Sequence, residues 1–334
     1  MDFKPVKWGV LGVSGHYRLR INNPMTDLEE EGIVEKTAIA SRDIKRAKEA
    51  AEEMGFKKAY GSYSELLEDK DIEAVYIPLP NHMHKEYVKM AADNGKHILC
   101  EKPLTMDLQD TIELVEYTKK KGVILMEAFM YRLHPQWEYA KRLIKAGEIG
   151  KISSIHVAFF YNNPDPSNIR NKKETGGGAI PDIGCYAVSC ARFLAGTEPK
   201  RVISLVNYDK DSLVDTLSSG ILDFGEMRSV FTVGTRTFNK QQVQVYGSSG
   251  YLEIDVPFNT YPDVPGKIRI TTSVGTRTVE TQEIDQYGIE FSEFSFAIRE
   301  NTAPPILPED AVANQKVLDA LFLSSEKNSW ITLD

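Results

Sequence analysis

The sequence predicts an α/β fold in two parts, a doubly wound parallel sheet followed by an α+β domain with a large, open and mostly antiparallel sheet. Up to residue 126, short apolar runs alternate with amphipathic segments of helical period, which is the pattern of right-handed βαβ units. Beyond residue 150, long segments alternate apolar and polar residues with little helix between them, as in an antiparallel sheet. The length of 334 residues is enough for two domains.

Five apolar runs are the predicted strands of the first sheet, at residues 8–12, 34–40, 74–77, 97–100 and 123–126. The intervening helices are clearest at 44–54, 84–92 and 105–122, and Gly95 and Gly122 stand where helices commonly end. We therefore expect a first domain of residues 1–126, with the doubly wound (Rossmann) topology, and a second domain of residues 127–334. A helix predicted at 135–146 could belong to either domain.

The second domain opens on a predicted strand over residues 152–161, in which apolar and aromatic residues share one side, namely Ile155, Val157, Phe159 and Tyr161. A helix at 182–194 follows a cluster of glycines. Further strand-like runs lie near 201–208, 213–224, 228–238, 242–255 and 267–284. Two closing helices are predicted at 291–298 and 309–325.

Composition excludes several classes of protein. Forty Lys and Arg against 48 Asp and Glu give a formal charge of -8, which argues against a nucleic-acid partner because neutralising phosphates takes clustered basic charge. Three cysteines without a C-x-x-C pair predict neither a disulfide framework nor a zinc site. His82 and His84 have no third ligand nearby in the sequence, so no metal is expected. With no signal-like leader and no apolar run of about 18 residues, we expect a cytoplasmic protein without a membrane partner.

A glycine turn follows the first predicted strand and opens a helix. Its segment, Gly12-Val13-Ser14-Gly15-His16, stands where a dinucleotide fold needs a tight turn, a close backbone approach to a pyrophosphate and N–H donors at a helix start. The spacing departs from the usual G-x-G-x-x-G, because Ser14 stands at the second glycine and Tyr17 at the third. The turn predicts a dinucleotide site, and a plain strand–turn–helix corner is the alternative.

The end of the second predicted strand indicates which dinucleotide is bound. An acidic residue there binds the 2′-hydroxyl of NAD, whereas an arginine accommodates the 2′-phosphate of NADP. The chain reads Ala40-Ser41-Arg42-Asp43, so Ser41 offers a hydroxyl and Arg42 a planar fork suited to phosphate. We expect NADP in preference to NAD. Alternatively, Arg42 is a solvated side chain and Asp43 a helix cap.

Two further segments carry candidate catalytic residues. Lys102 follows a predicted strand, and the carboxyl ends of parallel strands are where ligands bind, although a solvated lysine at a strand exit would look the same. Asp182 and Tyr186 stand four residues apart after the glycine cluster, so a helix places them on one face. A phenol beside an ammonium can exchange a proton, although most helical tyrosines simply pack. Tyr186 would face away from the sheet, because the helix would pack on it through a separate apolar stripe, Ile183, Ala187, Cys190 and Leu194.

Five segments, in order, resemble the Gfo/Idh/MocA oxidoreductase family along nearly the whole chain. They are the glycine turn, Pro80-Asn81-His82-Met83-His84, the GKHILCEKP segment at 95–103, the MEAFMYRLHP segment at 126–135, and the segment from Gly177 to Tyr186. Within that family, the chain most resembles the branch of dihydrodiol dehydrogenases, D-xylose dehydrogenases and glucose-fructose oxidoreductase. That branch carries a tyrosine at the position of Tyr186, where inositol dehydrogenases carry a histidine.

The resemblance implies a dinucleotide domain and a second domain whose open sheet commonly forms the subunit interface, hence a homodimer or homotetramer. It implies that Tyr186 is the proton donor or acceptor at a sugar hydroxyl, that Lys102 assists it, and that Asp182 binds substrate or orients the tyrosine. The peptide bond before Pro103 would be cis. The residues expected along the cofactor near the nicotinamide are Pro80, Asn81, His84 and Glu101.

We therefore expect an NADP-preferring oxidoreductase that transfers a hydride between nicotinamide and a secondary alcohol or carbonyl of a sugar or related diol. The alternatives are a keto-sugar reductase acting on a nucleotide-linked or free ketose, and a nucleotide-responsive regulator without turnover. A regulator has no need of a proton donor, so an intact set of Lys102, Asp182 and Tyr186 argues against it. The candidate substrate-binding residues are Arg132, Tyr161, Arg170 and Asp182.

Overall fold

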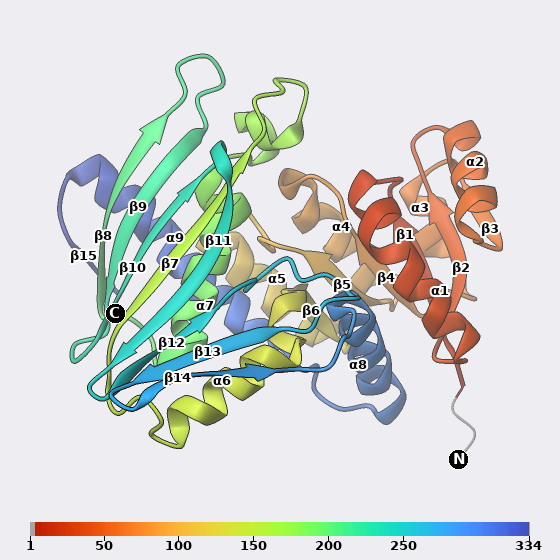
Figure 1. Ribbon diagram of the computed structural model, residues 1–334. Helices are drawn as coiled ribbons and strands as arrows, with labels where there is room; N and C mark the ends of the chain where they lie inside the picture. The colour runs from red at the N-terminus through yellow and green to blue at the C-terminus, as the bar shows by residue number, and fades with distance from the viewer. Residues whose placement is uncertain (1–3, 334) are drawn as a thin grey trace. The chain divides into compact units, whose positions relative to one another are not determined.

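The computed structural model describes residues 4–333. The chain divides into two compact units (Figure 1). The first comprises Met1–Met130 and Gln286–Val312, and the second comprises Tyr131–Asp285 and Ala313–Asp334. The first unit is therefore discontinuous in sequence.

A six-stranded parallel sheet, in the order β3-β2-β1-β4-β5-β6, forms the first unit. The strand order reverses between β1 and β4, which is the switch point where open sheets bind ligands. The predicted doubly wound sheet is confirmed. Its strands are β1 (Val6–Leu11), β2 (Val34–Ala40), β3 (Lys58–Tyr60), β4 (Ala74–Ile77), β5 (His97–Glu101) and β6 (Leu125–Ala128).

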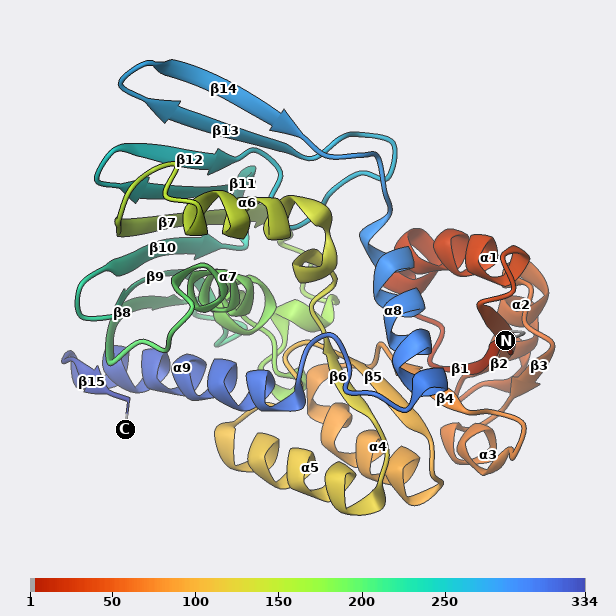
Figure 2. The same cartoon turned by 90° about the horizontal axis from the view of Figure 1, so that it is seen from below.

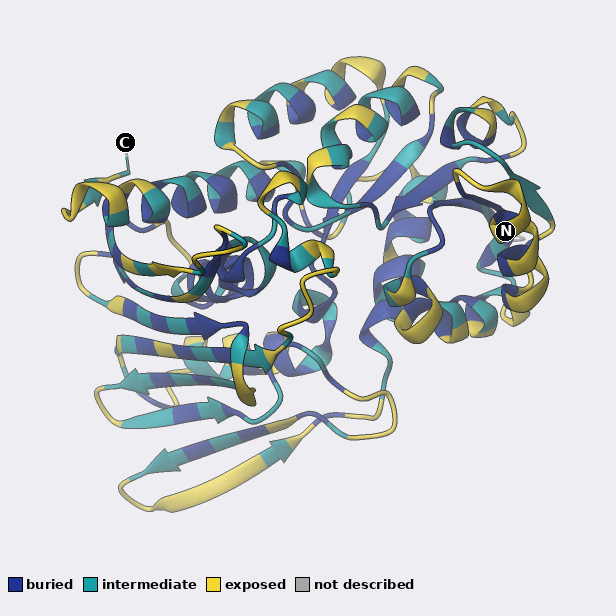
Figure 3. Cartoon of the chain, turned by 90° about the horizontal axis from the view of Figure 1, so that it is seen from above, coloured by how far each residue is buried: buried dark blue, intermediate teal, exposed yellow. Residues whose placement is uncertain are grey.

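Helices cover both faces of this sheet, and Figure 3 shows that their buried sides turn toward it. Helices α3 (Tyr63–Glu68), α4 (Asn81–Asp93) and α5 (Leu108–Lys121) share one apolar core. Helix α1 (Asn22–Glu30) packs on the other face with α8 (Gln286–Glu300). Helix α2 (Ile44–Met54) has the bounds that its sequence predicts, because Asp43 caps its start and Gly55, at φ 78°, ends it.

Helix α8 belongs to the first unit, although the sequence analysis placed its segment in the second domain. Phe291 lies edge-on to Trp8, with ring centroids 4.9 Å apart, and to Tyr76 at 5.3 Å. The indole Nε1 of Trp8 donates a hydrogen bond to Ser295 Oγ at 3.2 Å. This aromatic packing explains why the segment returns to the first sheet. The domain boundary near residue 126 stays a prediction.

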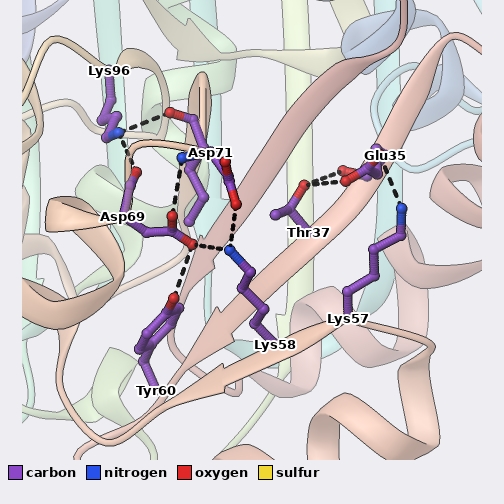
Figure 4. Close-up of polar contacts among 9 residues, drawn as sticks. Glu35, Thr37, Lys57, Lys58, Tyr60, Asp69, Asp71 and Lys96 are labelled. Carbon is purple, nitrogen blue, oxygen red and sulfur yellow. Dashed lines mark hydrogen bonds and ion pairs between the residues drawn. The ribbon is translucent and has the colours of Figure 1, made fainter.

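Ion pairs fasten the amino-terminal edge of the parallel sheet (Figure 4). The Lys58 ammonium lies 2.8 Å from an Asp69 carboxylate oxygen and 2.7 Å from Asp71. The Tyr60 hydroxyl donates to the same Asp69 carboxylate at 2.8 Å, and Lys96 donates to the Asp69 carbonyl at 2.6 Å. At this edge, the polar side chains therefore bind one another.

The second unit is built on a nine-stranded sheet in the order β14-β13-β12-β11-β7-β10-β9-β8-β15. Of its described strand pairs, all are antiparallel except β7–β10, which confirms the predicted mostly antiparallel sheet. Two predicted runs, 242–255 and 267–284, contain turns and form the β11–β12 and β13–β14 pairs. The strands are β7 (Ile152–Asn162), β8 (Arg201–Tyr208), β9 (Asp215–Asp223), β10 (Arg228–Gly234), β11 (Arg236–Gly247), β12 (Gly250–Ile254), β13 (Lys267–Thr272), β14 (Gly275–Glu280) and β15 (Ile331–Thr332).

Three helices, α6 (Pro135–Lys145), α7 (Cys185–Ala195) and α9 (Pro308–Lys327), lie on one face of the nine-stranded sheet (Figure 2). The alternation of β7 is as predicted, with Ile155, Val157 and Phe159 buried under these helices. The opposite face has no helix over it among the described residues. Within residues 4–333, no helix is long and apolar enough to cross a membrane.

Candidate active site

The turn after β1 is a capped helix start that keeps two amide groups for a ligand. Gly12 has φ 113°, a conformation that favours glycine. Ser14 Oγ accepts a hydrogen bond from the Tyr17 amide at 3.0 Å, so Ser14 acts as the N-cap. Within the described chain, the amides of Gly15 and His16 have no acceptor, and no atom lies within 4 Å of a Cβ added at Gly15. This arrangement fits an anion such as a pyrophosphate.

A π-helical turn, Tyr17–Ile21, explains how the chain accommodates tyrosine where the usual motif has its third glycine. The Tyr17 ring is fully buried and packs against Phe56 and Tyr76, with centroid distances of 5.7 and 6.1 Å. Glycine at that position normally permits close helix–strand packing. Here a wider turn, of a kind often found at functional sites, leaves room for a large side chain in the core.

The end of β2 presents the residues predicted to select the cofactor. Ser41 is buried, and its Oγ accepts a hydrogen bond from the Asp43 amide at 3.3 Å. Asp43 is the cap of α2, as the alternative interpretation proposed. Arg42 is exposed beside the Tyr63 hydroxyl. Burial raises the pKa of Tyr63, and the neighbouring guanidinium opposes that rise. Asp43 thus caps α2, and the Arg42 guanidinium beside it stays exposed.

Arg46 is a second cation at this site, and the sequence analysis missed it. Its Nη2 donates a hydrogen bond to the Val13 carbonyl at 2.8 Å, so the side chain reaches from α2 to the glycine turn. Arg46 also acts electrostatically on Tyr63, as Arg42 does. Arg46 lies in the first turn of α2, and nothing local in the sequence indicates that its side chain turns back to the glycine turn.

Glu101, at the carboxyl end of β5, connects three neighbouring elements. Its Oε1 accepts a hydrogen bond from the Tyr76 hydroxyl at 2.6 Å and lies 3.5 Å from His16 Nε2. Burial would raise the pKa of Glu101, but His16, Lys102 and Tyr76 outweigh it and lower the pKa to about 2. Glu101 is therefore a carboxylate that joins the ends of β4 and β5 to the glycine turn.

His84 braces the segment that carries Lys102. The Lys102–Pro103 peptide bond is cis. The His84 ring is fully buried, with Nδ1 2.9 Å from the Pro103 carbonyl and Nε2 2.8 Å from the Leu79 carbonyl. Burial lowers the pKa of His84, and the two carbonyls oppose that shift. Both ring nitrogens thus contact the protein. At the same edge, the start of α4 presents Pro80 and Asn81.

In the second unit, Asp182 gathers two of the predicted substrate-binding residues. One carboxylate oxygen accepts hydrogen bonds from the Tyr161 hydroxyl at 2.7 Å and from Arg170 Nε at 3.0 Å. Burial, with Asp182 beside it, raises the pKa of Tyr161. The Arg132 guanidinium lies 4.9 Å from the centre of the Phe193 ring on α7. Asp182, Tyr161 and Arg170 therefore form one hydrogen-bonded group.

Tyr186 is held by aromatic rings. It is 6% exposed, and its ring centroid lies 5.5 Å from Tyr131, 5.7 Å from Phe159 and 5.3 Å from Phe258. The prediction that Tyr186 faces away from the sheet is wrong, because Phe159 belongs to the buried face of β7. Helix α7 is buried on nearly all sides, so its apolar stripe does not decide which side chains face the sheet.

Asp182 lies in a π-helical turn, Ile180–Gly184, that continues into α7. The Cys185 amide donates to the Ile180 carbonyl, five residues back. Such a turn holds more residues than an α-helical turn. The spacing of four between Asp182 and Tyr186 therefore does not place them directly above one another, as it would in a regular helix.

Comparisons with known proteins identify the family of the chain. Residues 6–129 match the Gfo/Idh/MocA model described as an oxidoreductase family with an NAD-binding Rossmann fold, and residues 137–253 match a C-terminal domain of the same family. The chain is 37% identical, over 98% of its length and 99% of the relative's, to a D-xylose 1-dehydrogenase (NADP⁺) of Haloferax volcanii. It is 35% identical, over 65% of its length and 66% of the relative's, to a trans-1,2-dihydrobenzene-1,2-diol dehydrogenase of Xenopus tropicalis.

Among solved structures, a 3-ketoreductase of Actinomadura kijaniata in complex with NADP and TDP-benzene matches with a TM-score of 0.90 at 29% identity. The match covers 96% of this chain and 98% of the ketoreductase.

Proposed function

The chain belongs to the Gfo/Idh/MocA family of NAD(P)-dependent oxidoreductases, and from that premise we propose an NADP-preferring enzyme acting on a secondary alcohol or carbonyl of a sugar or related diol. The observation that carries the proposal is the helix start that presents Asp182, bound by Tyr161 and Arg170, just before Tyr186. The curated relative of Haloferax volcanii, an NADP⁺-dependent dehydrogenase of D-xylose, supports both the cofactor and the substrate class.

The first unit fits a dinucleotide at the carboxyl ends of its strands. The amides of Gly15 and His16 would hold the pyrophosphate. Ser41 and Arg42, with Arg46 beside them, would hold the 2′-phosphate that distinguishes NADP from NAD. Bound NADP supplies the hydride donor or acceptor. The residues that would lie near the nicotinamide are Pro80, Asn81, His84, Glu101 and Lys102.

The proton is assigned to Tyr186. In alcohol oxidation its oxygen takes the proton of the substrate hydroxyl as the hydride leaves the same carbon, and in carbonyl reduction the hydroxyl returns it. A phenol has a pKa near 10, so an ammonium beside it, that of Lys102, would stabilise the phenolate. Asp182 orients the substrate or the tyrosine. General acid–base help of this kind is worth about 10²–10⁴-fold in rate.

The test is Tyr186→Phe, with turnover followed at 340 nm across aldoses, ketoses and diols, with NADP and NAD separately. We expect kcat to fall by about 10²–10⁴-fold while the Kd for NADP is unchanged. Tyr139→Phe, which changes an exposed tyrosine, is the control. Full turnover in Tyr186→Phe on a verified substrate would overturn the proposal, and a preference for NAD would overturn its cofactor part.

A second candidate is a keto-sugar reductase acting on a nucleotide-linked ketose. It is favoured by the likeness to the 3-ketoreductase, whose structure holds TDP-benzene. Free and nucleotide-linked ketoses, compared by kcat/KM in the same assay, distinguish the two candidates. A free pentose or diol as the better substrate supports the leading proposal.

We further propose that the uncovered face of the nine-stranded sheet joins two or four copies of the chain. Leu205 on β8 is 68% exposed on this face, and Leu217 on β9 is 39% exposed, where buried apolar area would stabilise an interface. Light scattering of Leu205→Glu should show smaller particles than the native protein. Val274→Glu, at a turn and 95% exposed, should leave the mass unchanged. A native monomer would contradict this proposal.

A further inference from the structure

Asp215, the first residue of β9, caps the helix start that carries Asp182. Its side chain is 1% exposed. One carboxylate oxygen accepts hydrogen bonds from the Ile180 amide at 2.7 Å and from Ser218 Oγ at 2.9 Å, and the Ala179 amide also donates to the carboxylate. These are amides that a helix start leaves without partners inside the helix. The cap therefore comes from a strand of the sheet and not from the turn itself.

The glycine cluster before the helix is explained by close approach of the protein's own groups. Gly178 has φ 131°, and a Cβ there would overlap the Asp215 carboxylate. A Cβ at Gly177 would overlap the carbonyl of Arg170, the residue whose guanidinium binds Asp182. Both glycines thus let neighbouring segments reach the helix start. With the amides already occupied by Asp215, this cluster is not an anion site.

We propose that Asp215 is a positioning residue for the reaction, which holds the first turn of this helix so that Asp182 and Tyr186 keep their places. The inference rests on the proposed function, since it takes Asp182 and Tyr186 to be part of the catalytic machinery. The Asp182 amide donates to the Gly178 carbonyl at 3.1 Å. Gly178, which lies against the Asp215 carboxylate, and Asp182 therefore belong to one hydrogen-bonded turn. An ionised carboxylate is also favoured beside a helix N-terminus.

The surroundings of Asp215 give the cap a measurable pH dependence. Burial raises the pKa of Asp215 to about 6, and the hydrogen bonds from Ile180, Ser218 and Ala179 limit the rise. The titratable Tyr208 lies opposite it on β8, and the adjoining helix-start segment carries Arg170 and Asp182. Residues 229–234 of β10 carry no charge. Protonation removes one acceptor, so the cap weakens as pH falls through this range.

The test is Asp215→Asn in the full-length enzyme, measured from pH 5 to pH 8. We expect kcat at pH 7.5 to fall by about 10–100-fold, while KM and the Kd for NADP change by less than about twofold. The native kcat should decline below about pH 6, and the variant should lose this decline because its side chain does not titrate. Amide exchange at residues 179–186 should become faster. Asp211→Asn, an exposed aspartate four residues away, should match the native enzyme.

Ser218→Ala provides a second test, which does not depend on the folding of Asp215→Asn. It removes one donor to the carboxylate and leaves the carboxylate in place, so the decline in kcat should move to higher pH. A normal kcat and an unchanged acid limb in Asp215→Asn, or an unmoved limb in Ser218→Ala, would reduce Asp215 to a structural cap and overturn the inference. Full turnover in Tyr186→Phe would instead overturn the proposed function.

Discussion

The two units each begin a helix with a glycine turn and a π-helical turn, yet they cap it differently. In the first unit the Ser14 hydroxyl caps the Tyr17 amide from within the turn, and the two amides before it have no acceptor in the described chain. In the second unit the Asp215 carboxylate reaches in from β9 and binds the Ile180 amide. Glycines before a helix therefore do not by themselves identify an anion site. What decides is whether the chain occupies the amides itself.

The largest expected effect is on the affinity for NADP, and it comes from placing a carboxylate at the first helix start, as Asp215 does at the second. Ser14→Asp keeps a good N-cap, so stability should change by less than about 0.5 kcal/mol. Its carboxylate would face the pyrophosphate, and like charges about 4 Å apart near a protein surface cost about 4 kcal/mol. The Kd for NADP, measured by calorimetric titration, should rise at least about 100-fold. Ser14→Thr, which keeps the hydroxyl, is the control, and native affinity in Ser14→Asp would contradict the anion site.

The next effect concerns Arg42 and Arg46, the cations beside the first helix start. At the second helix start the Asp215 carboxylate already binds the amides. Arg42→Ala should lower the ratio of kcat/KM for NADP over NAD by about 10–100-fold, because charge-assisted hydrogen bonds to the 2′-phosphate are lost. Arg46→Ala should lower kcat/KM for both cofactors, since Arg46 also holds the Val13 carbonyl. Arg20→Ala, an exposed arginine, is the control. An unchanged ratio in Arg42→Ala would refute its role in selecting NADP.

Two glycine substitutions should separate the helix starts by opposite readouts. Gly178→Ala forces a side chain against Asp215 at a positive φ, and we expect it to lower the free energy of unfolding by about 2 kcal/mol. Gly15→Ala meets no protein atom within 4 Å, so its stability should stay within about 0.5 kcal/mol of the native value, while its affinity for NADP falls. Urea unfolding and NADP titration of both variants test this, and the reverse pattern would contradict it.

The smallest expected effect is on the pH dependence of stability. It concerns a buried carboxyl group that, unlike Asp215, caps no helix. Glu290 on α8 is 1% exposed, and its Oε1 has no hydrogen-bond partner among the described residues. Burial, with Glu101 nearby, raises the pKa of Glu290 well above its usual range. The folded chain therefore keeps a proton that the unfolded chain releases, and the free energy of unfolding falls as pH rises above about 4.5.

Glu290→Gln removes this titration. Between pH 5 and pH 6, the stability of the native protein relative to the variant should fall by about 1 kcal/mol. Urea unfolding at both pH values measures the difference, and Glu293→Gln on the same helix is the control. A constant difference between native protein and variant would show that Glu290 is ionised in the folded state.

The fold was predictable where a segment has an apolar pattern of its own or carries residues that mark its ends. Strand β4 has the predicted bounds because it is a continuous apolar run, and β2 has them although Glu35, Lys36 and Thr37 interrupt its apolar residues. Strand β3 and helix α3 have three and six residues, too few for a periodic pattern to emerge. The turns inside β11–β12 and β13–β14 lack proline, and the predicted runs continue across them.

The candidate site was predictable where chemistry depends on neighbours in sequence. The glycine turn, Ser41-Arg42 and Lys102 each follow a strand, and a strand end can be recognised locally. Asp215 could not be recognised, since the Ile180 amide that it binds lies 35 residues earlier in the chain. The orientation of Tyr186 was wrong for a related reason. Rings from β7 and from Phe258 cover it, and helical spacing carries no information on what covers a helix.

Helix α8 has a consequence for how the protein is made. Domains generally fold as units during synthesis, beginning with the N-terminal one, but the first sheet of this chain waits for a helix that is translated near the end. Until then, Trp8 and Tyr76 have no Phe291 to pack against, and Glu73 lacks the Arg299 guanidinium that binds it at 2.6 Å. A nascent chain that has already formed all six parallel strands thus still exposes aromatic surface on the ribosome. It offers that surface to chaperones until α8, Gln286–Glu300, has been translated.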